Sequence, residues 1–219
     1  MFARTRHPAG ADAPTRGRII RWARFYDPLV AVATLGRAPA MREQAADLAA
    51  LRPGESVLDV GCGTGELTQR ARARVGPPGR VCGIDPSADM IAVAREKSAR
   101  AGLGIEYRVA AIEHLPFPDA SFDVVLSSLM MHHLPEDLKL IGLGEVRRVL
   151  EPDGRLLIVD LKRGSGLLHR LTLPMLIHHD LSYGVQDLTP VVSAAGFTDI
   201  QTGDTRFRTL GFVSARAPT

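Results

Sequence analysis

The segment VLDVGCGTGELT, residues 57–68, constrains the fold of this chain more than any other part of the sequence. A short apolar run leads into Gly61, Gly63 and Gly65, and helix-forming residues follow. Glycines leave the backbone bare, so a ligand can approach this turn closely and meet the N-terminus of the following helix. Many α/β proteins use such a turn only to reverse the chain, so the loop alone predicts a strand–loop–helix unit and leaves the ligand open.

The same rhythm of strand, loop and helix repeats beyond this segment. The runs that read as strands before the last helix are 56–60, 81–84, 105–110, 122–128 and 154–161, and EPDG (151–154) reads as a turn. Strands that alternate with helices predict a parallel sheet with helices on both faces. Two final runs, 197–204 and 205–217, have no helix between them, so we expect an antiparallel hairpin at the sheet edge.

An acid at the end of the second strand narrows the class of ligand. Asp85 lies 20 residues after Gly65, where a carboxylate can accept hydrogen bonds from both ribose hydroxyls. A nicotinamide-binding loop would place its third glycine at Glu66, and a carboxylate there opposes a pyrophosphate. The pattern therefore favours a ligand with a ribose but no phosphate. Asp59, beside the loop, suits a cationic group such as an amine or a sulfonium.

Four segments, in their order and spacing, resemble a known family: DVGCGTG, GIDPSADMIAVAR, EHLPFPDASFDVVLSSLMMHHLP and EVRRVLEPDGRLLIVD. Together they resemble the class I S-adenosylmethionine-dependent methyltransferases, in the branch similar to the ubiquinone and menaquinone biosynthesis methyltransferases. The resemblance covers residues 53–161. It implies an α/β, Rossmann-like seven-stranded sheet, mostly parallel with an antiparallel C-terminal hairpin and with helices on both faces. It also implies S-adenosyl-L-methionine as the cofactor.

The resemblance also implies roles for individual residues of the cofactor site. The glycines of the loop line the cofactor, Asp59 lies near its methionine end, Asp85 holds the ribose and Met90 packs on the adenine. The remaining candidate cofactor-binding residues are Cys62, Ala111, Ile112, Glu113 and Ser128. The family typically has Asp-Ala-Glu where this chain has Ala111-Ile112-Glu113. Without the acid at the first position, adenine recognition relies on backbone groups, on apolar walls or on Glu113 turning inward.

Two adjacent histidines follow the fourth strand, at the sheet edge where ligands bind in such folds. His133 is the candidate for a catalytic base or a substrate contact, and His132 is a weaker candidate; hydrogen-bonded support of the loop is the alternative for both. Methyl transfer from a sulfonium requires a base only when the acceptor is protonated. We expect no metal site, because adjacent histidines rarely chelate one ion and no cysteine or acid stands at ligand spacing.

Further residues are candidates for the acceptor side. Tyr26, from an N-terminal helix, and His178, His179 and Tyr183, from the apolar segment between the fifth strand and the last helix, are expected to line an acceptor pocket; ordinary packing is the alternative. Three consecutive side chains at 178–180 cannot readily converge on a metal ion. Cys62 and Cys82 are expected to be packing residues.

The domain organisation follows from composition and charge. Residues 1–17 are expected to be a disordered basic arm, since residues 1–24 hold six arginines against one acid. We expect a single domain over 18–219, with an N-terminal helical cap (18–51) and an acceptor-site insertion (162–186). No run approaches the ~18 apolar residues of a membrane span, and the cytoplasm is the expected location. The arginine-rich start is also compatible with a transit peptide.

The function predicted from these patterns is transfer of a methyl group to a small, apolar acceptor such as a quinone, a phenol, a lipid or a secondary metabolite. The basic arm can touch anionic lipid peripherally, while no nucleic-acid partner is expected. A nucleic-acid methyltransferase is a weaker alternative, because SSLMMHHL replaces the Asn/Asp-Pro-Pro-Tyr type of motif that grips a flipped base. A non-catalytic cofactor-binding partner or sensor is the other alternative. The sequence predicts no oligomeric state.

Overall fold

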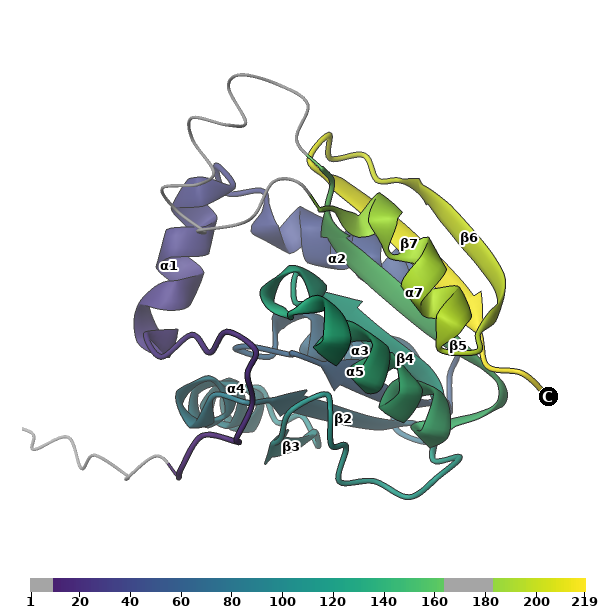
Figure 1. The fold of residues 1–219 in the computed structure, drawn as a ribbon. Helices are drawn as coiled ribbons and strands as arrows, with labels where there is room; N and C mark the ends of the chain where they lie inside the picture. Colours follow the sequence, from purple (N-terminus) through teal and green to yellow (C-terminus); the bar gives the residue numbers. More distant parts are fainter. Residues whose placement is uncertain (1–9, 164–182) are drawn as a thin grey trace, which may run out of the picture.

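A computed structural model describes residues 10–163 and 183–219 of the chain. The expectations for His178 and His179 lie outside these residues. Figure 1 shows a central twisted sheet with helices on both faces and α1 at one side of the molecule. Within the described residues no helix is long and apolar enough to cross a membrane.

Seven strands form one sheet in the order β3-β2-β1-β4-β5-β7-β6. The first five strands pair in parallel, and β7 pairs antiparallel with both β5 and β6. The predicted fold class, a mostly parallel sheet with an antiparallel C-terminal hairpin, is confirmed. The strands are β1 (Ser56–Val60), β2 (Arg80–Asp85), β3 (Glu106–Val109), β4 (Phe122–Ser128), β5 (Leu150–Leu161), β6 (Thr198–Asp204) and β7 (Leu210–Arg216).

Helices cover both faces because each strand presents apolar side chains on both sides. One face packs on α2 (Ala38–Leu48), α3 (Glu66–Val75) and α4 (Ala88–Arg100), through Val57, Val81 and Val124 among others. The opposite face packs on α5 (Glu136–Val149) and α7 (Thr189–Ala194) through alternate residues such as Leu58 and Ile84. The short 3-10 helices η1 (Met131–His133) and η2 (Val185–Asp187) lie beside β5.

One segment that the sequence predicts to be a turn is part of a strand. EPDG, residues 151–154, was expected to be a turn, but β5 already begins at Leu150. The pairing of β4 with β5 shifts between Phe122 and Val124, and Asp153 has a φ of 66°. A bulge therefore accommodates these residues at the start of the strand.

The N-terminal segment contacts the domain earlier than the sequence predicted. Residues 1–17 were expected to be a disordered arm; residues 1–9 lie outside the described residues, whereas residues 10–17 lie against the fold. The backbone N–H of Ala13 donates to the carbonyl of Pro86 (2.9 Å), and the Asp12 carboxylate accepts from the N–H of Ala88 (3.0 Å). Asp12 therefore binds the first residue of α4, where a negative charge is favourable.

Two helices lie within residues 18–51, the range predicted to form an N-terminal helical cap. α1 (Ala23–Ala33) packs against α4, and α2 packs against α3, so neither belongs to a separate unit. The backbone N–H of Arg18 donates to the carbonyl of His133 (3.2 Å), which joins the segment before α1 to the loop after β4. The N-terminal part of the chain therefore forms one side of the region where the carboxyl ends of the strands meet.

Candidate active site

A pocket lies at the carboxyl ends of β1, β2 and β4, with about 920 Å³ of empty space including its open mouth. Ten of the predicted cofactor residues line it: Asp59, Gly61, Cys62, Gly63, Asp85, Met90, Ala111, Ile112, Glu113 and Ser128. Residues from separate sequence motifs thus surround one pocket, and the roles of the individual side chains remain predictions.

The three glycines of the loop differ in their position relative to the pocket. Gly61 and Gly63 line it, while Gly65 does not. A Cβ on Gly61 would lie 2.3 Å from Cγ of Met130, and one on Gly65 would lie 2.5 Å from the hydroxyl of Tyr107. Gly65 also has a φ of 81°, where side chains other than glycine are strained. Gly65 is therefore required by the geometry of the turn and by close packing.

Asp85 fixes the loop and still faces the pocket. Its carboxylate accepts from the backbone N–H of Gly63 (3.0 Å) and from that of Ser87 (2.8 Å). Burial raises the pKa of Asp85 to about 6. Each carboxylate oxygen can accept more than one hydrogen bond, so the side chain retains capacity for a diol in the pocket.

A buried acid and an arginine lie together at another part of the pocket wall. Asp59 accepts a hydrogen bond from the hydroxyl of Thr68 (2.6 Å), and burial raises the pKa of Asp59 to about 6. The positive charge of Arg42, on α2, acts against this rise. Nη1 of Arg42 is buried and has no hydrogen-bond partner in the described part of the chain. This wall therefore presents both signs of charge to a ligand.

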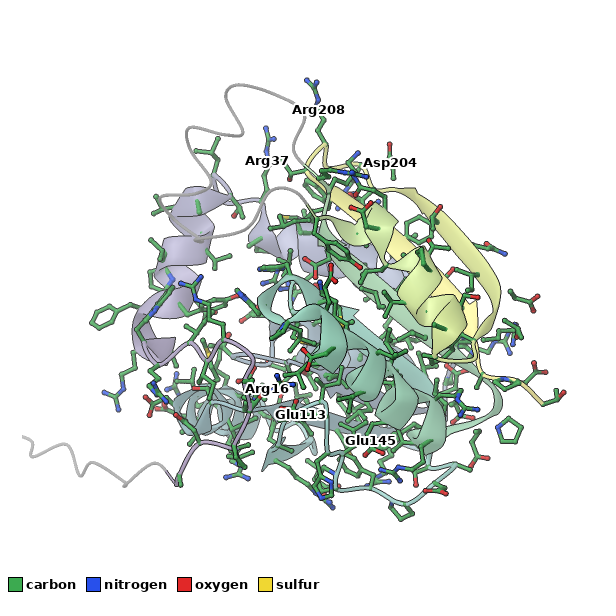
Figure 2. The ribbon with its side chains drawn as sticks, viewed as in Figure 1. Arg16, Arg37, Glu113, Glu145, Asp204 and Arg208 are labelled. Atoms are coloured by element: carbon green, nitrogen blue, oxygen red, sulfur yellow. The ribbon has the colours of Figure 1, made fainter. Side chains whose placement is uncertain are left out.

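A third polar group faces the pocket from the loop after β3. Oε2 of Glu113 is buried and accepts no hydrogen bond from any residue that the structure describes. Around it, Ala111, Ile112 and Met90 provide apolar walls. Figure 2 labels Glu113 among the side chains of the described residues. An acid for a donor group on a flat apolar ligand is thus present at this loop, at the third position of the family's Asp-Ala-Glu pattern and not at the first.

The two histidines separate into different environments. His133 lines the pocket, whereas His132 does not. Nδ1 of His132 lies 2.6 Å from the carboxylate of Asp160, which also accepts from the backbone N–H of His132 (3.2 Å). Burial alone raises the pKa of Asp160, but the adjacent His132 outweighs burial and holds that pKa below its usual value. Asp160, at the end of β5, therefore anchors η1 and orients His133 indirectly.

The two predicted substrate tyrosines also differ in position. Tyr26 lines the pocket, and burial raises the pKa of its hydroxyl. Tyr183 instead lines a smaller hollow beside His132 and Asp160. Its hydroxyl donates to the carbonyl of Asp187 (2.9 Å), and Nζ of the buried Lys139 lies 3.6 Å from its ring centre. Tyr183 therefore does not meet the other candidates in the main pocket.

Several residues of the pocket wall were missed by sequence reasoning. They are Thr15, Gly17, Arg18, Ile20, Arg42, Leu129 and Met130. None belongs to the glycine-loop motif, and only the apolar character of residues 129–134 gave a signal. Both cysteines are buried, and burial raises the pKa of the Cys62 thiol, in keeping with packing roles. No group of three or more potential metal ligands occurs in the ranges 10–163 and 183–219.

Comparisons with known proteins identify relatives of this chain. A family described as "Methyltransferase domain" matches residues 57–154. A demethylmenaquinone methyltransferase of Thermus thermophilus is 34% identical over 67% of this chain and 67% of its own length. A ubiquinone/menaquinone biosynthesis C-methyltransferase of Hahella chejuensis is 40% identical over 53% of this chain and 47% of its own. An arsenite methyltransferase of Halobacterium salinarum is 41% identical over 51% of this chain but 28% of its own.

Solved structures show the same fold. A SAM dependent methyltransferase from Aquifex aeolicus aligns with a TM-score of 0.69 at 26% identity, over 80% of this chain and 89% of its own. The [4+2]-cyclase SpnF aligns with a TM-score of 0.73 at 20% identity, over 96% of this chain and 99% of its own. At that identity SpnF supports the fold alone. The chain spans about half the length, or less, of several curated relatives, but two thirds of the Thermus enzyme. On the fold, the pocket and these matches, the chain belongs to the family of S-adenosylmethionine-dependent methyltransferases.

Proposed function

We propose that the protein transfers a methyl group from S-adenosylmethionine to a small, apolar acceptor. The observation that supports this most directly is the distribution of polar groups in the pocket. Asp59 is on β1, and Arg42 lies near it on α2. Asp85 is at the end of β2, and Glu113 is in the loop after β3. Because the sheet order is β3-β2-β1, Asp85 lies between the other two positions.

This order matches the three parts of S-adenosylmethionine. Asp85, in the middle, has free acceptor capacity for the ribose hydroxyls. Asp59 suits the methionine ammonium, and the buried Nη1 of Arg42 suits its carboxylate. Met90 and Ile112 suit the adenine ring, with Oε2 of Glu113 accepting from the exocyclic amine. When bound, the cofactor supplies an electrophilic methyl group on a sulfonium.

The other walls of the pocket favour an apolar acceptor. Ile20, Leu129, Met130 and Leu134 are all apolar, and Tyr26 adds an aromatic ring with one hydroxyl. Methyl transfer is an in-line displacement, so the work of these residues is to align the acceptor and to exclude water. The quinone-related names of the Thermus and Hahella relatives make quinones and phenols the first acceptors to test.

His133 is the side chain proposed to contact the acceptor. It lines the pocket, and its backbone N–H donates to the carbonyl of Met130 (2.9 Å), which holds η1 in place. Replacing His133 with Gln retains hydrogen-bonding capacity but removes the imidazole, which is the group able to accept a proton. If His133 only positions the acceptor, the Gln variant keeps turnover and the Ala variant loses it. If His133 takes a proton, both variants lose turnover while they still bind S-adenosylhomocysteine.

Cofactor binding and turnover provide the test of the proposed function. Calorimetry with S-adenosylhomocysteine is expected to show one site per chain. Incubation with S-adenosylmethionine and a panel of quinols, phenols and amines is expected to release S-adenosylhomocysteine with the quinols or phenols. Binding without turnover on any acceptor would support a non-catalytic cofactor-binding protein, and turnover on amines alone would remove the apolar-acceptor proposal. Absence of cofactor binding would contradict the proposal entirely.

A further inference from the structure

Large apolar side chains are concentrated on the outside of α1. Seven large apolar side chains are exposed in the described part of the chain, and five of them lie between residues 22 and 35. They are Trp22, Phe25, Leu29, Val32 and Leu35, with exposures from 37% to 83%. Scattered apolar side chains are ordinary on a protein surface, but a contiguous group of this kind marks an interaction site.

The spacing of these residues puts them on one side of the helix. Trp22, Phe25, Leu29 and Val32 follow one another at intervals of three and four residues, which gives one face of an α-helix. On the other side of the helix Ala23 is buried, and at the margin of the face Tyr26, whose ring centre lies 5.8 Å from that of Trp22, lines the pocket. Figure 1 shows α1 at the edge of the molecule, away from the sheet. The apolar face therefore points away from the core.

The exposed charges that α1 and its flanking residues contribute beside this face have one sign. Arg24 and Arg37 are exposed, and Figure 2 shows Arg37 projecting away from the fold. Asp27 is the sole acid in the sequence from 18 to 37, and it is engaged inward by Nζ of Lys97 (2.9 Å) and the hydroxyl of Thr64 (2.7 Å). The outer surface of α1 is therefore apolar and basic.

We propose that the α1 face, defined as Trp22, Phe25, Leu29, Val32 and Leu35 with Arg24 and Arg37, docks on an anionic lipid surface. A helix with an apolar face and flanking arginines lies in a membrane interface, with its apolar side chains among the acyl chains and its cations near the headgroups. A second copy of the chain would bring like charges together. The chain's own segment 164–182 contains one arginine and one acid, so it cannot neutralise the two arginines. Charge complementarity thus favours anionic lipid.

Docking in this way has a consequence for the acceptor, and that part rests on the proposed function. Tyr26 and Ile20 line the pocket from the inner side of the same N-terminal region. A helix with its side chains is about 10–12 Å across, so lipid on the outer side of α1 lies about one helix diameter from this wall. An apolar acceptor dissolved in the bilayer is then held close to the pocket.

Vesicle binding by matched variants tests the proposal. The full chain is sedimented with vesicles of phosphatidylcholine containing phosphatidylglycerol, and with vesicles of phosphatidylcholine alone. The double variant Phe25→Glu with Val32→Glu is expected to bind the anionic vesicles at least about tenfold more weakly than the unaltered chain does. It loses apolar contacts and adds two negative charges that the lipid headgroups repel. The matched control is Leu140→Glu with Ile141→Glu, which makes the same change at the two other exposed apolar residues, on α5. The control is expected to bind as the unaltered chain does.

Each alternative occupant predicts a different result. No binding of the unaltered chain to anionic vesicles, or an equal loss in both double variants, overturns the proposal. A concentration-dependent dimer that Phe25→Glu with Val32→Glu abolishes, without vesicle binding, assigns the face to a second copy. If the unaltered chain does not bind vesicles and that variant has a lower melting temperature, the α1 face is assigned to the chain's own segment 164–182. Serine at both positions replaces glutamate if the charged variant fails to bind S-adenosylhomocysteine. Vesicle binding is measured without an acceptor, so its outcome is independent of whether methyl transfer is found.

Discussion

Arg42 makes the sharpest test of how the pocket holds its cofactor. Nη1 of Arg42 is buried without a hydrogen-bond partner in the described residues, beside Asp59. Replacing Arg42 with Met keeps a long, helix-compatible side chain and removes the guanidinium. A hydrogen bond to a charged group contributes about 1.5–3 kcal/mol. The variant is therefore expected to bind S-adenosylhomocysteine about 10- to 150-fold more weakly, at 1.4 kcal/mol per factor of ten.

A ligand that lacks the amino-acid part separates a direct contact from a structural effect. Calorimetry with methylthioadenosine, which has no carboxylate, is expected to give the same affinity for the Arg42→Met variant and the unaltered chain. Arg37→Met, a change of an exposed arginine just before α2, is the matched control and is expected to leave both affinities unchanged. If Arg42→Met weakens both ligands equally, Arg42 acts through the structure of the pocket. If it weakens neither, the carboxylate is held elsewhere, and the reasoning is refuted.

The same variant also has a predictable pH dependence. Burial raises the pKa of Asp59 to about 6, and the charge of Arg42 opposes that rise. The ionised carboxylate attracts the ligand's ammonium, so affinity falls as the pH decreases through the pKa of Asp59. Without Arg42 that pKa is higher. The acid-side loss of affinity is therefore expected at a higher pH in the variant, in calorimetric titrations from pH 5 to pH 8.

Three further changes test other parts of the site. Glu113→Gln is expected to reduce the preference for S-adenosylhomocysteine over its inosine analogue, measured as the ratio of the two dissociation constants; an unchanged ratio would place the exocyclic amine elsewhere. Gly65→Ala is expected to lower the free energy of unfolding by about 1–3 kcal/mol in urea, because φ is strained and the new Cβ meets the Tyr107 hydroxyl; Tyr107→Phe should recover part of the loss, and no recovery would argue against the clash. Asp160→Asn removes a carboxylate whose pKa is lowered by His132 in the folded state. The variant is expected to have a lower free energy of unfolding than the unaltered chain above pH ~4, the pKa of an aspartate in the unfolded chain. The difference should shrink as the pH falls below that pKa, and a difference that does not depend on pH would contradict the prediction.

The fold was largely predictable because its signals are local. Each parallel strand is a short apolar run, and each turn contains glycine or an acid, so the order of strands and helices follows from the sequence. The glycine loop and Asp85 could be located as a pair, since the ends of adjacent parallel strands meet at the same edge of the sheet. The bulge at the start of β5 was missed because its positive-φ residue, Asp153, reads equally well as part of a turn.

The parts of the site that were missed depend on contacts between distant segments. Arg42 lies 17 residues before Asp59, within a helix whose other residues show only that it packs against the fold. The separation of His132 from His133 was likewise hidden, because successive residues of a short helix face different directions. It becomes clear only when β4 and β5 are paired, since Ser128 lies beside Val159 and Asp160 then follows at the same edge. The two adjacent histidines thus differ in their surroundings because the neighbouring strand ends in an acid.

The charges of the pocket also support the choice of ligand made from the sequence. Glu66, at the first position of α3, lines the pocket and forms ion pairs with Lys97 and Arg70. A pyrophosphate would need that helix N-terminus for its own charge, and the carboxylate of Glu66 in its first turn would repel the phosphates. Asp59 and Asp85 add two further acids, each with a pKa raised to about 6 by burial. A cationic ligand relieves the cost of keeping such acids ionised, so the pocket favours a sulfonium over a phosphate-bearing nucleotide.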